Sequence, residues 1–97
     1  MGKDDSTVSK IYKYVLQPNF GTLRMPQGAQ VLTAQMQNDT PCLWAKVDPT
    51  RPTEWRTFNV YGTGQEIPDD PHLVYVATFQ MSGGALVWHV FESTSAG

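Results

Sequence analysis

The segments Leu73-Val-Tyr-Val-Ala-Thr-Phe-Gln-Met81, Ser82-Gly-Gly84 and Ala85-Leu-Val-Trp-His-Val-Phe91 decide the fold class of this chain. The first and third segments are rich in β-branched and aromatic residues, as strands usually are. The glycine pair Gly83-Gly84 suits a two-residue hairpin turn, because glycine readily adopts the positive φ angles that such turns require. The sequence therefore predicts a β-hairpin over residues 73–91.

This turn sets a pairing register between the two strands. Phe79 is expected opposite Trp88, and Ala77 opposite Val90, on a face that is almost entirely apolar. Tyr75 falls on the same face, opposite Glu92, through the two-residue period of a strand. We expect this face to line the core. Ser82 and Ala85 are expected to form the pair next to the turn.

The other face of the hairpin is mixed in character. It is expected to pair Thr78 with His89, and Val76 with Phe91. Because this face carries polar groups beside one large aromatic ring, we expect it to be available to a partner.

A second hairpin is predicted over residues 29–37 and 42–47, with a turn at Asn38-Asp39. Residues 29–37 contain several good helix formers, but their alternation of apolar and polar side chains favours a strand. The expected pairs are Ala34 with Leu43 and Leu32 with Ala45 on an apolar face, and Thr33 with Trp44, Gln35 with Cys42 and Val31 with Lys46 on a mixed face. Two hairpins thus show the same division into an apolar and a mixed face.

The whole chain is predicted to be mainly β. The predicted strands cover residues 10–16, 29–37, 42–47, 53–61, 73–81 and 85–91, and residues 23–26 form a short extended bridge. Short strands separated by turn signals predict a small antiparallel β-meander of about six strands, either a sandwich or a partly closed barrel. We expect a single domain over residues 10–92, with disordered tails at 1–9 and 93–97 because these ends carry little apolar surface.

Composition excludes several classes of function. The 97 residues carry a net charge of −2 and the pI is near 5.5, whereas a nucleic-acid module usually has a basic patch. No segment approaches the roughly 20 apolar residues of a membrane span. The lone Cys42 has no cysteine to pair with, which is compatible with a reducing compartment and indicates the cytoplasm.

Catalytic and metal-binding patterns are weak. In the predicted register, His72 and His89 lie about 20 Å apart at ~3.3 Å per residue, and Cys42 is interpreted as a buried structural residue. The segment from Glu66 to Asp70 is acidic, but its spacing matches no known calcium loop, so we interpret it as a solvated turn. We therefore expect a protein that is not an enzyme, with no metal and no cofactor.

Aromatic and cationic side chains on the mixed faces are the best candidates for binding. Exposed tryptophan, tyrosine and arginine often anchor interfaces, and aromatic stacking with cationic groups would suit a nucleotide. Trp44 has an equally good alternative, burial beneath a second apolar layer. The candidate binding residues are Trp44, Lys46, Arg56, Tyr61, Thr63 and His89.

Several short phrases resemble a known family as a set. They are Met25-Pro-x-Gly-Ala29, Gln35-x-Gln37, Pro41-Cys-Leu-Trp44 with Val47-Asp48, Arg56-Thr-Phe58, Tyr61-Gly-Thr-Gly64 and Trp88-His-Val-Phe91. This pattern over residues 11–92 resembles short uncharacterised proteins, a domain of unknown function, encoded by bacteriophages and by prophages. The resemblance implies a small accessory protein made inside a bacterium, and it implies no catalytic or ligand residue.

These observations together predict a small non-catalytic binding protein that acts on a host factor in the bacterial cytoplasm. The expected partner is a host protein or a small polar ligand such as a nucleotide, and the action would be inhibition of a defence system or capture of a small ligand. Self-association through edge strands would give a homo-oligomer. The alternative is a structural or assembly protein of a phage.

Overall fold

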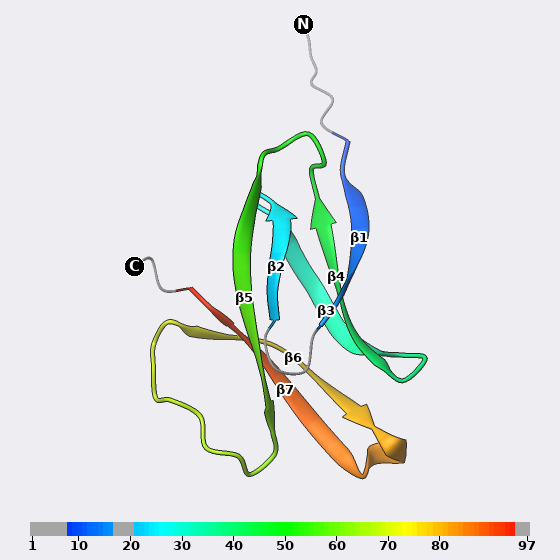
Figure 1. Cartoon of the computed structure of the whole chain (residues 1–97), viewed down its shortest axis with the longest axis vertical. Coiled ribbons are helices and arrows are strands. Elements are labelled where there is room, and N and C mark those ends of the chain that lie inside the picture. Colours follow the sequence, from blue (N-terminus) through cyan, green and yellow to red (C-terminus); the bar gives the residue numbers. More distant parts are fainter. Residues whose placement is uncertain (1–7, 17–20, 95–97) are drawn as a thin grey trace, which may run out of the picture.

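The computed structural model describes residues 8–16 and 21–94, and these residues form seven strands and one 3-10 turn (Figure 1). The elements are β1 (Lys10–Val15), β2 (Gly21–Pro26), β3 (Gln30–Gln37), β4 (Thr40–Val47), β5 (Thr53–Gly62), β6 (Leu73–Met81), η1 (Ser82–Gly84) and β7 (Leu86–Ser93). The predicted mainly β fold is confirmed, and residues 29–37 form a strand as expected.

The strands form two antiparallel sheets with the orders β1-β4-β3 and β2-β5-β7-β6. The residues expected as a short extended bridge belong to β2, which pairs with β5 along its whole length. The chain crosses between the sheets after β1, after β2 and after β4, so its order departs from a simple meander. Over the described residues, the two sheets stay separate and do not close into a barrel.

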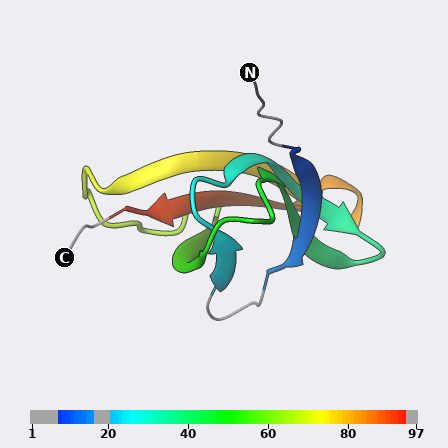
Figure 2. The same cartoon turned by 90° about the horizontal axis from the view of Figure 1, so that it is seen from above.

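The hydrophobic core lies between the two sheets, which Figure 2 shows from above. It draws on both sheets because alternate residues of β4, β5 and β7 point inward. The largest fully buried side chains are Phe58, Leu16, Met25, Leu43, Val47, Val90 and Cys42. Of these, Cys42 does not belong to the core cluster, since it lies on the other face of β4.

The β3–β4 hairpin closes on the predicted two-residue turn. Asn38 and Asp39 have φ angles of 51° and 65°, as a type I′ turn requires. The pairs Ala34–Leu43, Thr33–Trp44 and Gln35–Cys42 are confirmed. These pairs lie close to the turn, and the turn therefore sets their register.

Farther from this turn, the predicted register was wrong. A β-bulge between Val31 and Thr33 leaves Leu32 unpaired and 46% exposed. Val31, not Leu32, lies opposite Ala45, and Gln30, not Val31, lies opposite Lys46. An extra residue in one strand exchanges the two faces of everything beyond it.

The β6–β7 hairpin has a longer turn than predicted. Met81 and Leu86 form the last pair, and the loop between them is a 3-10 turn closed by a hydrogen bond from Ala85 N to Ser82 O of 3.2 Å. Ser82 and Ala85 therefore do not pair in the ladder as predicted. A four-residue loop keeps the same register as a two-residue loop, so the neighbouring pairs are unaffected.

The pairs Phe79–Trp88, Ala77–Val90 and Thr78–His89 of this hairpin are confirmed. A second bulge between Tyr75 and Ala77 then shifts the register, and Tyr75 lies opposite Phe91 instead of Glu92. Tyr75, predicted to be in the core, is 57% exposed.

The same bulge turns the side chain of Val76 toward the core. It packs against the core, so the prediction of Val76 on the mixed face opposite Phe91 was also wrong.

The strand β7 extends beyond the predicted domain end at residue 92. Ser93 is its last residue, and Thr94 N donates a hydrogen bond of 2.7 Å to His72 O. Residues 1–7 and 95–97 of the predicted tails lie outside the described residues. In the described part of the chain, no helix has the length and hydropathy to cross a membrane.

Candidate functional site

The six binding residues predicted from sequence fall in three separate places. Tyr61, Thr63 and His89 gather on the outer face of the four-stranded sheet. Trp44 and Lys46 lie on the outer face of the three-stranded sheet, on the far side of the core. Arg56 points to the inner side of the four-stranded sheet. In the described part of the chain, the six predicted residues therefore do not line a single pocket.

His89 is held between two threonines on the outer face. Its Nε2 lies 2.8 Å from Thr63 Oγ1, and its Nδ1 lies 3.0 Å from Thr78 Oγ1. Thr78 Oγ1 in turn lies 2.7 Å from the hydroxyl of Tyr75. The ring is oriented by neutral hydroxyl groups, whereas a catalytic triad uses a carboxylate that stabilises the imidazolium ion. This arrangement fixes the orientation of the ring.

Aromatic rings extend the same face. Phe91 lies edge-on to both Tyr61 and Tyr75, with ring centroids 5.9 and 5.6 Å away. Sequence reasoning missed Tyr75, because the bulge beside Val76 brings it to this side of the sheet. Bulges of this kind leave no clear signal in a single sequence.

Trp44 is partly buried and Lys46 is exposed on the opposite side of the molecule. Trp44 lies between Lys13 of β1 and Thr33 of β3. The neighbouring Cys42 on this face is 2% exposed, and its thiol lies 3.5 Å from Thr40 O. No second layer of strands covers this face in the described chain, so the alternative of Trp44 beneath such a layer is not observed.

Arg56 is occupied by contacts within the protein. Its Nε and Nη2 donate to the Glu92 carboxylate at 2.6 and 2.8 Å, and its Nη1 donates to Ala29 O at 2.5 Å. The hydrogen bonds that Arg56 donates to Glu92 raise the pKa of Arg56, although burial acts in the opposite direction. The guanidinium therefore links β5 to β7 and to the segment that leads into β3.

The acidic segment behaves as a turn. Asp70 Oδ1 accepts a hydrogen bond of 2.8 Å from His72 N and lies 3.1 Å from His72 Nδ1. Among the described residues, no group of three or more His, Cys, Asp or Glu side chains is placed to hold a metal ion.

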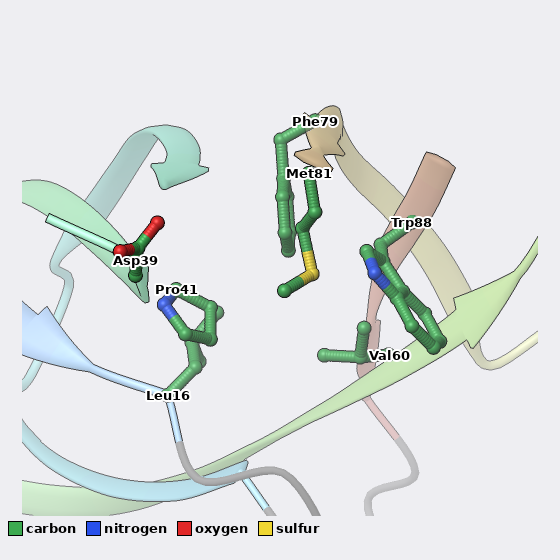
Figure 3. Close-up of a pocket in the computed structure, with 7 residues that line it drawn as sticks. All are labelled: Leu16, Asp39, Pro41, Val60, Phe79, Met81 and Trp88. Atoms are coloured by element: carbon green, nitrogen blue, oxygen red, sulfur yellow. The ribbon is translucent and has the colours of Figure 1, made fainter. Parts of the chain in front are cut away.

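An apolar cavity of about 290 Å³ lies between the two sheets, and sequence reasoning did not identify it (Figure 3). We call it the inter-sheet cavity. Residues of the β3–β4 and β6–β7 hairpins, which diverge at the lower right of Figure 1, contribute to its wall. Its lining residues are Leu16, Asp39, Pro41, Val60, Phe79, Met81 and Trp88.

The indole of Trp88 carries an unusual polar group in this wall. Its Nε1 is buried and has no hydrogen-bond partner among the described residues. Figure 3 shows the nitrogen on the side of the ring that faces Met81. The opposite edge of the ring packs on Gly62, where an added Cβ would lie 3.2 Å from Trp88 Cζ3. The glycine therefore limits the position of the ring.

Asp39 is the one ionisable residue among the lining residues. It is exposed, it belongs to the β3–β4 turn, and Figure 3 shows it across the cavity from Trp88. The cavity thus has mostly apolar walls and one carboxylate among its lining residues. No local sequence pattern could have found it, because its residues come from β4, β5, β6, β7, the β3–β4 turn and the residue after β1.

Comparison with known proteins gives a family and no relative of known activity. Neither the curated proteins nor the solved structures contain a match to this chain. The profile of one protein family matches residues 8–97, which is nearly the whole chain and all of the described strands. The chain therefore belongs to the family described as a domain of unknown function (DUF7352).

Proposed function

We propose that this domain is a non-catalytic protein that binds a small ligand in the inter-sheet cavity. The observation that carries the proposal is the apolar cavity itself, which has a volume of about 290 Å³ and is lined by side chains from both sheets.

The walls of the cavity support binding by burial of apolar surface. Val60, Phe79 and Met81 present hydrocarbon, aromatic and thioether groups to the same space. Ligand sites are usually concave and mostly apolar, with a few polar groups that fix the orientation of the ligand. Asp39 supplies a polar group among the lining residues.

The arrangement of the polar groups, in the cavity and outside it, favours binding over catalysis. Asp39 is the single ionisable residue of the cavity wall, and no nucleophile with an adjacent base is found in that wall. His89, the best candidate for a general base, points away from the cavity and bonds to Thr63 and Thr78. A nucleophile, a base and an orienting group must meet at one place for covalent catalysis.

The test uses naphthalene as an apolar probe and measures the melting temperature of the full chain. Binding to the folded state adds a stabilisation of RT ln(1 + [L]/Kd), so the melting temperature rises with the logarithm of the ligand concentration once this concentration exceeds Kd. We expect a concentration-dependent rise for the wild type and for Val87→Phe, which adds a ring on the outer face of β7. We expect no rise for Val60→Phe or Met81→Trp, which fill the cavity.

Two results would contradict the proposal. The first is a wild-type protein whose melting temperature does not respond to naphthalene. The second is a response that persists in both filled variants, since the probe would then bind elsewhere. Two filling variants are used so that the result does not depend on one substitution that fails to fold.

We further propose a bacterial cytoplasmic setting and a phage or prophage gene as the source of the chain. The support is the set of sequence phrases, such as Met25-Pro-x-Gly-Ala29, that resemble phage-encoded proteins. In that setting, ligand capture would remove a small signal molecule from the host cell. Genome neighbourhoods of family members test this: most should contain phage genes, and neighbourhoods made of ordinary metabolic genes would contradict it.

A further inference from the structure

We propose that β1 is a docking edge for an extended segment of a partner protein, which adds to the three-stranded sheet as a fourth strand. The segment carries an acidic side chain between two apolar ones, in the pattern apolar–x–acidic–x–apolar. None of the β1 residues is among those that line the inter-sheet cavity, so this docking edge is independent of the proposed function.

The backbone of β1 has a side that no described strand occupies. β1 is the first strand in the order β1-β4-β3, and it forms the upper right border of the fold in Figure 1. Leu16, the residue after β1, donates a hydrogen bond of 2.9 Å from N to Pro41 O. Because backbone groups alternate in direction along a strand, every second residue back from Leu16 also bonds to β4. The N–H and C=O groups of Ile11, Lys13 and Val15 therefore point outward, where a further strand can bond to them.

Apolar side chains stand beside these outward groups. Ile11 is 63% exposed and Val15 is 43% exposed. They lie on the outer face of the sheet, because Ile11 is opposite Lys46 and Val15 is opposite Cys42. An edge strand with exposed apolar side chains is a template for pairing with another chain. Cross-strand neighbours pack side by side, so the two apolar residues of the partner belong opposite Ile11 and Val15.

Lysines determine the charge that the partner needs. Lys13 lies between Ile11 and Val15 on the outer face, and Lys46 on β4 lies opposite Ile11. Both lysines are exposed, and Lys13 Nζ donates a hydrogen bond of 2.7 Å to the neutral amide oxygen of Gln37. A carboxylate opposite Lys13 would have both ammonium groups nearby. The charge complementarity therefore favours an acidic residue at the centre of the segment.

The same side chains disfavour a second copy of β1 as the partner. An antiparallel pair of β1 strands would bring Lys10 and Lys13 of both copies to one seam. Like charges on neighbouring strands are destabilising, and lysine on an edge strand commonly prevents self-association. The edge therefore discriminates against its own copy and favours a strand of opposite charge.

Two capped peptides test the proposal with the full chain. Thr-Val-Thr-Glu-Thr-Val-Thr has the required pattern, and Thr-Val-Thr-Lys-Thr-Val-Thr replaces its glutamate with lysine. NMR titration at low ionic strength measures Kd and locates the peptide. We expect saturable shifts of the amide resonances of Ile11, Lys13 and Val15, and about fivefold tighter binding of the glutamate peptide than of the lysine peptide. No saturable shift at β1, or equal affinity for the two peptides, would overturn the proposal.

Two substitutions at Lys13 separate the backbone contribution from the charge. Lys13→Pro removes the central outward N–H group, which the ladder to β4 does not use. Proline is tolerated at such positions of an edge strand, so this variant should fold and bind neither peptide. Lys13→Glu should remove the preference for the glutamate peptide. The matched control is Arg24→Glu, the same change of charge on β2 at the edge of the other sheet, and it should keep the preference.

The variants also define the results that contradict the proposal. If Lys13→Pro binds the glutamate peptide as tightly as the wild type does, the peptide does not add to β1. A preference for glutamate that persists in Lys13→Glu shows that the lysine does not select the partner, and this result decides even if Lys13→Pro fails to fold. Analytical ultracentrifugation without peptide gives a further check. A wild-type dimer that dissociates in Lys13→Pro would mean that the edge pairs with a second copy instead.

Discussion

Arg56 and Glu92 form a bidentate ion pair on the inner side of the four-stranded sheet, with N–O distances of 2.6 and 2.8 Å. Their side chains are only 17% and 15% exposed. Arg56 also donates to Ala29 O, just before β3 of the other sheet. The pair therefore satisfies two buried charges and ties the two sheets together.

The variant Arg56→Ala should lower the free energy of unfolding by about 3 kcal/mol, because it leaves the Glu92 carboxylate largely buried without a partner. Urea denaturation measures this change. The matched control is Arg24→Ala, on the exposed outer face, where Arg24 lies over Trp55 and bonds to Thr53. This control should cost less than about 1 kcal/mol. Equal losses in the two variants would show that the Arg56–Glu92 pair has no special role.

Asp48 gives the fold a predictable response to acid. Thr50 donates two hydrogen bonds to the Asp48 carboxylate, from Oγ1 at 2.7 Å and from N at 3.0 Å. These bonds lower the pKa of Asp48 from its ordinary value of 3.8. Because the folded state prefers the ionised form, the stabilisation is present above this value and is lost as the pH falls through the folded pKa.

Asp48→Asn should therefore be less stable than the wild type near neutral pH. The difference in unfolding free energy should shrink as the pH is lowered from about 6 to about 2, measured by denaturation at a series of pH values. In Thr50→Ala, which lacks the hydroxyl donor, the added effect of Asp48→Asn should be smaller. A difference that stays constant with pH would refute the role of this carboxylate.

Gly62→Ala should move the Trp88 ring. The new Cβ would lie 3.2 Å from Trp88 Cζ3, which is closer than an ordinary carbon contact. We expect a loss of about 1 kcal/mol and a changed NMR shift of the Trp88 indole N–H. The control is Asn59→Ala on the outer side of β5, and this variant should leave that resonance in place. An unchanged resonance in Gly62→Ala would mean that the glycine does not position the ring.

Near the two hairpin turns, the sequence was sufficient to predict the pairing. Thr33–Trp44 and Thr78–His89 were both expected and are both observed. A short turn brings neighbouring residues of the chain together, so local turn chemistry and alternation determine the register there.

Away from the turns, the pairing depended on the rest of the molecule. The bulges at Leu32 and Val76 shift each strand by one residue, and Tyr75 moves from the predicted core to the outer face. Packing between the two sheets determines which residue is unpaired at each bulge. The sequence of one strand alone does not specify that residue.

The candidate sites divide in the same way. Thr63 and His89 were predicted from the sequence to take part in binding. Thr63 Oγ1 lies 2.8 Å from His89 Nε2 in the structure. Their role in binding stays a prediction. Arg56 was proposed for the same role and instead bonds within the protein. The β5–β7 pairing sets Glu92 opposite Phe58, two residues from Arg56 on the same face of the sheet, so the two charged side chains meet.

The sequence by itself determined that the chain is β, where its hairpins turn and which face of each hairpin is apolar near the turn, because these properties depend on residues close together in the chain. The tertiary structure decided the order of the strands in two sheets, the pairing of Arg56 with Glu92 and the existence of the inter-sheet cavity. These features require residues that are far apart in sequence to meet, such as Leu16 and Trp88 in the cavity wall. Their packing depends on how the two sheets fit together and not on any local pattern.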